Sequence, residues 1–202
     1  MDTPVYQSFT ANIDRAKALI RIFDRGRSRG RPRKEDTQLT RSALVFTIGA
    51  LDAYLHDLVL EVAGKFVPES DELDRAVKAM DPQDLVQNLA RAKTHDQVQE
   101  RFRRRLDEHF DDASFMGVKG LQRALKLVGC PMGLDELSVN LGRPKFKQEL
   151  GRYTDQRHRI IHRGENVRVK KEQADDCVDL VWNIVGNVDD AVASKYYGGE
   201  SE

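Results

Sequence analysis

The stretch ALVFTIGALDAYLHDLV, residues 43–59, decides the fold of this chain. It lies inside the longest helical pattern of the sequence, which covers residues 36–66 and stops at Pro68. Apolar side chains recur there every three or four residues and form one broad face, made of Leu44, Ile48, Leu51, Leu55, Leu58 and Val62, joined by Val45, Val59 and Phe66. A face this broad is buried by several neighbours at once, so we expect this helix at the centre of a helical bundle.

Three further long helices are expected around it, over residues 8–23, 146–162 and 170–197. In the last of these, Trp182 is expected to anchor the core. Ser70 and Asp81 have the form of helix N-caps in the intervening region. We therefore expect residues 68–142 to form an insertion of shorter helices between the long helix at 36–66 and the one at 146–162. These shorter helices are expected over residues 70–80, 81–92, 95–110, 118–128 and 134–141.

These patterns predict an all-α fold: a bundle of four long helices with short inserted helices, in a single domain over residues 1–202 whose tail, 197–202, is frayed. Charged residues make up 33% of the chain and aromatic residues 7%, which is typical of a soluble helical protein. Cys130 and Cys177 lack a metal or redox spacing, so we expect both to be reduced. No apolar run approaches roughly 18 residues and the start has no signal-peptide form, which predicts a cytoplasmic protein with no membrane contact.

Positive charge gathers in two places, although the formal net charge is zero. Residues 25–34, RGRSRGRPRK, are expected either to form a mobile, solvated connection or to act as an arm that neutralises RNA phosphates. The cations of that arm would be Arg27, Arg29, Arg31, Arg33 and Lys34. The second run, residues 101–105, is interpreted as a solvated face, which would extend a positive groove if it lay near residues 25–34.

The end of the helix at residues 146–162 carries RHRIIHRG, residues 157–164. Gly164 suits the position just past a helix end. His158 and His162 are four residues apart and share a face, whereas Arg157 and His162 are five apart, about 140° around the helix. Either the long side chain of Arg157 bends round, or a second copy of the chain supplies the partner. The second alternative places the site at an interface.

Asp52 and His56 also stand four residues apart, inside the long apolar helix. They can form a hydrogen-bonded pair at the helix surface. Alternatively, Asp52 faces Arg157 or His162 and orients it, since a buried carboxylate needs a cationic partner. Asp52, His56 and the two histidines of the helix end could also supply metal ligands, but their spacing matches no metal motif, so we expect no metal.

The Arg-x4-His pattern from Arg157 to His162, the sequence IIHRGE around it and the segment at residues 43–59 resemble the HEPN superfamily, most closely its RiboL-PSP-type or MAE_28990-type proteins. The resemblance implies the same helical fold and a metal-independent endoribonuclease without cofactor. Arg157 and His162 would be catalytic, and His158 would take the motif's polar position, where Asn or Asp is commoner. Arg159 is expected to support the site, and Arg163 to bind RNA.

The resemblance further implies a homodimer whose two motifs form one cleft. It also implies a toxin or anti-phage defence effector with an antitoxin or defence-system partner.

The residues themselves allow this chemistry. The ribose 2′-OH of RNA lies beside the phosphate, so an enzyme need only move protons and stabilise negative charge. A histidine can do the first near neutral pH and an arginine the second. Two other classes stay open. One is a module that binds RNA or a nucleotide without cleaving it. The other is a helical adaptor in which Arg157, Arg159 and His162 pair with carboxylates such as Asp52 and Asp155.

Overall fold

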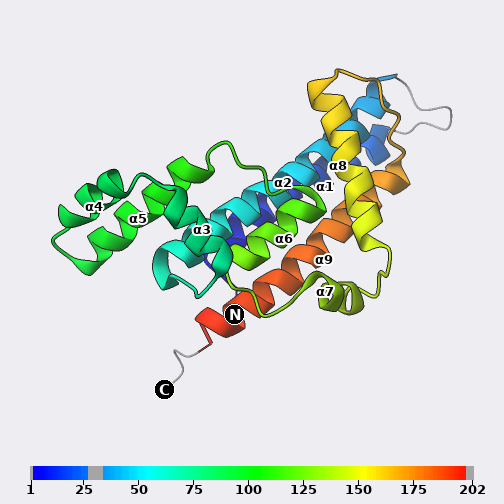
Figure 1. Ribbon diagram of the computed structural model, residues 1–202. Helices are drawn as coiled ribbons and strands as arrows, with labels where there is room; N and C mark the ends of the chain where they lie inside the picture. Colours follow the sequence, from blue (N-terminus) through cyan, green and yellow to red (C-terminus); the bar gives the residue numbers. More distant parts are fainter. Residues whose placement is uncertain (1, 27–33, 199–202) are drawn as a thin grey trace.

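The computed structural model describes residues 2–26 and 34–198 (Figure 1). Within these residues the chain is helical and contains no strand, which confirms the predicted all-α class. Its helices are α1 (Tyr6–Gly26), α2 (Lys34–Phe66), α3 (Asp71–Ala79), α4 (Pro82–Ala90), α5 (His95–Phe110), α6 (Gly117–Leu127), α7 (Leu134–Asn140), α8 (Phe146–His162) and α9 (Lys171–Tyr196). With 16 residues, α5 is nearly as long as α8 with 17, so length alone does not set four helices apart.

Helix α2 is the centre of the molecule, as its apolar pattern predicts. It packs against α1, α9, α5, α8 and α6. Each of the six side chains that define its apolar face is completely buried: Leu44, Ile48, Leu51, Leu55, Leu58 and Val62. Among the described helices it alone is long and apolar enough to cross a membrane, but 61% of its most apolar window is buried inside the bundle. Its burial is that of a core helix.

Helices α1 and α9 complete the core beside α2. On α1 the apolar side chains at helical spacing form one stripe that is buried along its whole length: Phe9, Ile13, Ala16, Ile20 and Phe23. Trp182 of α9 packs near Tyr6 and Phe9, with ring centroids 6.2 and 5.8 Å away, and Lys17 lies 3.9 Å from the centroid of its ring. Trp182 therefore joins α9 to α1, as expected of a core anchor.

A buried carboxylate that the sequence patterns did not predict ties the N-terminal residues to this core. Asp189 of α9 is 1% exposed. It accepts hydrogen bonds from the backbone N–H of Thr3 at 2.9 Å, from the Thr3 hydroxyl, and from the Tyr54 hydroxyl at 2.9 Å. Burial and the adjacent carboxylate of Asp189 raise the pKa of Tyr54 well above its usual range. These three donors compensate for the loss of water around the carboxylate.

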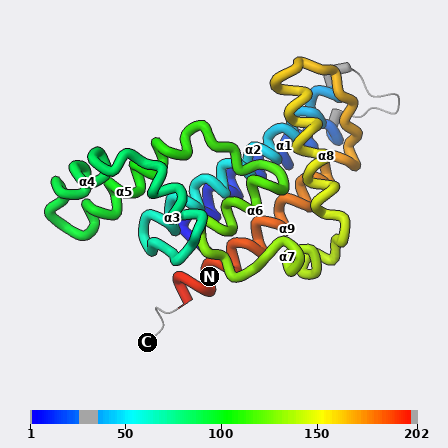
Figure 2. Tube along the Cα trace, in the orientation of Figure 1, coloured from blue at the N-terminus to red at the C-terminus, as the bar shows by residue number. Residues whose placement is uncertain are grey.

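The insertion between α2 and α8 includes an arm made of α4 and α5, which projects from one end of the bundle (Figures 1 and 2). The predicted N-caps are present: the Ser70 hydroxyl accepts from Leu73 N–H and the Asp81 carboxylate from Gln83 N–H. Helix α4 packs on α5 and buries none of its own residues. The position of α4 therefore depends on polar contacts more than on an apolar core.

His56 joins the arm to α2. Its Nδ1 lies 3.9 Å from an oxygen of Asp57, and its Nε2 lies 3.7 Å from an oxygen of Asp107 on α5. The Asp57 carboxylate raises the pKa of His56 above its usual range, and the charges of Asp107 and Asp52 add to this effect, while partial burial opposes it. Protonated His56 thus bridges carboxylates of two helices.

We expect replacement of His56 by Gln to lower stability more at pH 5.5 than at pH 8.5, values on either side of the usual histidine pKa of about 6.5. Because the pKa is raised in the folded state, the contribution is fully present below the unfolded-state pKa and is lost as the pH rises through the folded-state pKa. Urea denaturation of both proteins across this range measures the difference. A difference that is constant, or that grows with pH, would show that the charge of His56 does not join the two helices.

Candidate functional site

Helix α8, whose last turns carry the Arg-x4-His motif, is packed against the bundle through one stripe of buried side chains. Phe146, Leu150 and Tyr153 are each at most 1% exposed. The hydroxyl of Tyr153 donates to Asp176 of α9 at 2.6 Å, which fixes the rotation of α8 against α9. The next position on the same stripe, four residues on, is Arg157. A cation therefore stands where the helical period calls for an apolar residue.

The side chain of Arg157 is half-buried, and its Nε is buried without a hydrogen-bond partner. Its far end reaches the surface, where Nη1 lies 3.4 Å from Nε2 of His162. Arginine can only donate, so this contact requires Nε2 of His162 to carry a lone pair. Arg157 and His162 point about 140° apart around the helix, and the long side chain of Arg157 bends round to reach His162. The pair forms within one chain.

The two histidines share a face, as their spacing predicts. The rings of His158 and His162 lie with centroids 4.8 Å apart, tilted by 37°. Both side chains are exposed at the last turns of α8. The helix ends at Gly164, whose φ of 63° is the left-handed conformation that glycine adopts without strain. The chain turns away there and leaves both imidazoles open to a ligand.

The other arginines of the motif segment are paired with a carboxylate. Glu165 accepts from Arg159 through Nε and Nη2, both at 2.7 Å, and its second oxygen lies 3.7 Å from Arg163. Arg41 of α2 donates to the carbonyl of Glu165 at 2.8 Å and to Asn166 at 2.9 Å. The Arg159 guanidinium lowers the pKa of Glu165, and the carboxylate raises that of Arg159.

Arg157 has no carboxylate within 4 Å in the part of the chain that the structure describes. Arg159 and Arg163, in contrast, share Glu165. The adaptor interpretation expects all the motif cations to pair with acids, and Arg157 does not. Sequence reasoning missed the roles of Glu165 and Arg41. Glu165 is the last residue of the sequence IIHRGE, so its position next to the motif could have pointed to its role. Nothing in the sequence near Arg41 indicates that it contacts the residues after α8.

Asp52 and His56, which were expected to support the site, have other partners in the structure. Asp52 accepts hydrogen bonds from the backbone N–H of Phe115 at 2.7 Å and from the Ser114 hydroxyl at 3.3 Å. It thus holds the connection between α5 and α6 and satisfies two donors there, so it has no need of a cation. His56 pairs with the arm, as described above. Within the described residues, no group of three or more His, Cys, Asp or Glu side chains is placed to hold a metal ion.

Only some of the predicted RNA-binding residues lie in the part of the chain that the structure describes. Arg27, Arg29, Arg31 and Arg33 lie outside the described residues. Lys34 is the first residue of α2, and Arg25 belongs to α1, so the interruption between the helices is shorter than residues 25–34. The basic run at 101–105 lies on α5 beside the C-terminal half of α2, far from the end where α2 begins. The run therefore does not lie near Lys34, the described end of the first basic segment, which was the condition for a shared positive groove.

The fold and the site together define an all-helical protein with an Arg–His pair at the end of a bundle helix. The family model RiboL-PSP-HEPN matches residues 10–194, which is nearly the whole chain. The chain therefore belongs to the RiboL-PSP-HEPN family. No curated protein and no solved structure matches it.

We expect Arg157→Leu to leave stability unchanged or to raise it by about 1 kcal/mol, since a buried polar group without a partner costs roughly 1–3 kcal/mol. For a chain of this size that is about 2–4 °C in melting temperature. Thermal denaturation followed by circular dichroism measures it. The matched control is Arg152→Leu, which removes an exposed guanidinium that donates to Tyr153 at 2.9 Å. Loss of stability on Arg157→Leu alone would mean that Arg157 is a structural residue.

Proposed function

We propose that this chain is a metal-independent endoribonuclease in which Arg157 and His162 carry out the reaction. The observation that supports it most is the place of Arg157: a cation on the buried stripe of α8, without a carboxylate, that reaches His162. A residue kept for stability would not be charged at this position. Membership of the RiboL-PSP-HEPN family supports an activity on RNA.

The chemistry uses the two side chains for different tasks. The Nε2 lone pair of His162 takes the proton of the ribose 2′-OH, and the 2′ oxygen attacks the adjacent phosphorus. The guanidinium of Arg157 leaves His162 and binds the non-bridging oxygens, where charge grows in the transition state. The bond from phosphorus to the 5′ oxygen breaks, and that oxygen takes a proton from His158, whose ring lies 4.8 Å from that of His162. The products are a 2′,3′-cyclic phosphate and a 5′-OH.

The charged residues around Arg157 and His162 are consistent with these two separate roles. Arg159 and Arg163 keep their charge near the site but are held by Glu165, so they add positive potential without competing for the phosphate. Arg163 is 61% exposed and held only at 3.7 Å, which leaves it free to contact a neighbouring phosphate. Arg27, Arg29, Arg31, Arg33 and Lys34 are proposed to add affinity in the same way.

We also propose that the protein is a homodimer in which the ends of two α8 helices face each other. Ile161 on α8 and Phe46 on α2 are 49% and 50% exposed, although both are large and apolar. Contact between two copies would cover such side chains. In the cell we place the enzyme in the cytoplasm as a toxin or anti-phage effector. An antitoxin or defence-system partner would restrain it, since free cleavage of RNA harms the host.

Replacement of His162 by Ala should reduce RNA cleavage by about 10²–10⁴-fold, and Arg157→Ala by about 10²–10³-fold. The assay is incubation of purified protein with total RNA in EDTA, followed by end-group analysis of the fragments. His95→Ala and Arg152→Ala are the matched controls and should cleave like the wild type. A requirement for a divalent metal, or cleavage of an RNA with 2′-deoxyribose at the cut position, would contradict the mechanism.

Mixing the Arg157→Ala and His162→Ala proteins should not restore cleavage, because each copy supplies its own Arg–His pair, 3.4 Å apart. Light scattering should show a dimer for the wild type and for both variants. The mixture is unfolded and refolded together, so that mixed dimers form before activity is measured. Recovered cleavage would mean instead that Arg157 acts on the histidine of the other copy.

A further inference from the structure

A second concave surface lies between α2 and the arm, away from α8. It encloses about 840 Å³ and is lined by the C-terminal half of α2, the end of α4 and one face of α5. Among the described residues that line it, Leu60 is the only apolar side chain, and none is Phe, Tyr or Trp. Four arginines face it: Arg91, Arg101, Arg103 and Arg104. We call this surface the arm groove.

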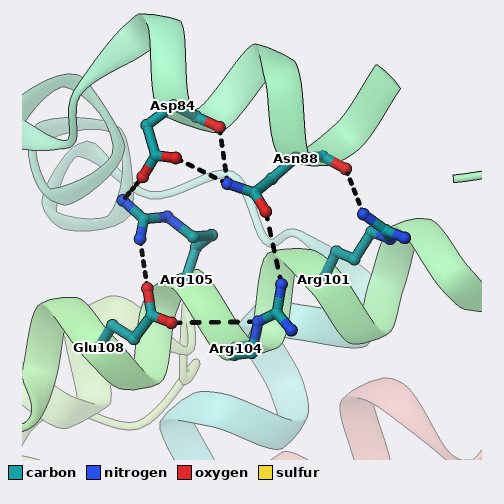
Figure 3. A network of polar contacts seen from close by, with 6 residues as sticks. All are labelled: Asp84, Asn88, Arg101, Arg104, Arg105 and Glu108. Atoms are coloured by element: carbon teal, nitrogen blue, oxygen red, sulfur yellow. Dashed lines mark hydrogen bonds and ion pairs between the residues drawn. The ribbon is translucent and has the colours of Figure 1, made fainter. Parts of the chain in front are cut away.

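The arginines of α5 differ in how far their charge is balanced (Figure 3). Arg105, which does not line the groove, is held between Asp84, at 2.5 Å, and Glu108. Arg101 donates to the backbone carbonyl of Asn88 at 3.0 Å, and Arg104 to its side-chain oxygen at 3.4 Å. Neutral oxygens therefore position these two guanidinium groups while their charge remains.

The other arginines that line the groove also differ in how closely a carboxylate approaches them. Arg104 has one carboxylate nearby, Glu108, at 3.9 Å from Nε. Arg103 lies 3.5 Å from Glu61. Arg91 is exposed at the end of α4 and makes no ion pair or side-chain hydrogen bond within the described residues. Arg91 and Arg101 thus hold positive charge on one surface without an ion pair among the described residues, and Arg104 has only the contact with Glu108 at 3.9 Å.

Three carboxylates also line the groove, and two of them are engaged. Asp57 and Asp107 flank His56, at 3.9 and 3.7 Å. Glu100 is exposed and has no partner of its own in the described part of the chain. The groove therefore presents two guanidinium groups held by neutral oxygens, those of Arg101 and Arg104, and the exposed Arg91. Against them stands one carboxylate without a partner among the described residues, that of Glu100.

The lining selects the class of ligand. Planar guanidinium groups in fixed positions suit phosphate oxygens. A nucleotide or an RNA base would need a stacking or apolar surface. The one ring in the lining, His56, is held between Asp57 and Asp107, and no Phe, Tyr or Trp stands beside it. An open surface lined by arginines is suited instead to the phosphodiester backbone, whose contacts position a strand without reading its sequence.

An uncovered face of α2 connects the groove with the motif end. Phe46, Gly49, Ala53 and Asp57 follow one another at helical spacing, and each is exposed or half-buried. A Cβ added at Gly49 would meet nothing within 4 Å. From Arg41, which contacts the residues just after α8, to His56 in the groove is 15 residues, or about 22 Å along α2.

We propose that the arm groove is a second binding place for the phosphate backbone of the same RNA, about 22 Å along α2 from Arg41, which contacts the residues just after α8. The proposal rests on the proposed function in taking RNA as the ligand. A strand long enough to reach both places is bound at its cut site and, independently of base sequence, at the groove. A short strand occupies only the end of α8.

The double variant Arg91→Gln with Arg104→Gln tests this, because Arg91 has no ion pair among the described residues and Arg104 has only the one with Glu108 at 3.9 Å. Binding is measured by fluorescence anisotropy between 50 and 200 mM salt. The probes are 2′-O-methyl RNA strands of about 20 and about four nucleotides, which bind but cannot be cut. The control is Arg75→Gln with Lys78→Gln, two exposed cations of α3 outside the groove.

For the long strand, loss of two phosphate contacts should reduce the slope of log affinity against log salt by about 1.4. The affinity change across that fourfold range of salt then shrinks roughly sevenfold. The short strand and the control variant should behave like the wild type. An unchanged slope for the long strand, or an equal loss for the short one, overturns the proposal. Arginine-dependent binding of polyglutamate without an effect on RNA would overturn it in favour of an acidic protein.

Glu100→Gln provides a test that misfolding cannot imitate. Removal of the free carboxylate should strengthen binding of the long strand and steepen its salt slope, while Glu69→Gln, an exposed acid outside the groove, should change neither. Weaker or unchanged binding for Glu100→Gln counts against the groove. Failure of the wild type to cut RNA, with the groove effects present, would refute only the ribonuclease. Cleavage with an unchanged slope would refute only the groove.

Discussion

Helix α2 must bury apolar side chains around most of its circumference, and the other helices are arranged to satisfy that requirement. Side chains such as Leu51 and Leu58 are completely removed from water, and each contributes about 1.5–3 kcal/mol relative to an exposed position. No single neighbour could cover so broad a face. Helices α1, α9, α8, α6 and α5 therefore share it. The position of both charged surfaces follows from which part of α2 each neighbour covers.

The end of α8 shows a conflict between stability and chemistry. The stripe of Phe146, Leu150 and Tyr153 holds the helix against its neighbours, and Arg157 continues that stripe with a charge. Its Nε lies buried without a partner, a cost that the folded state bears. In return, the packed helix α8 brings the guanidinium of Arg157 within reach of His162. A similar side chain on a surface loop would lose more conformational freedom on binding a phosphate.

Pairing with carboxylates sorts the many arginines of this chain into two groups. Arg159 and Arg105 are each held by close ion pairs, at the end of α8 and in the arm. Arg157, Arg101 and Arg91 are positioned by packing, by neutral oxygens or by their place at a helix end, and keep an unbalanced charge. A net charge of zero thus conceals two separate positive surfaces at different parts of α2.

The sequence by itself determined the helices, the central place of α2, the end of α8 at Gly164 and the shared face of the two histidines. These properties depend on residues within about four positions of each other, so the helical period contains them. Only the tertiary structure decided that Arg157 bends to His162, that Glu165 neutralises Arg159 while Asp52 holds the connection before α6, and that the basic run of α5 faces α2. Asp189 likewise shows its role only when Thr3 and Tyr54, 186 and 135 residues away, donate to it. A charged side chain takes the partner that folding brings within reach, and packing of distant helices sets that partner.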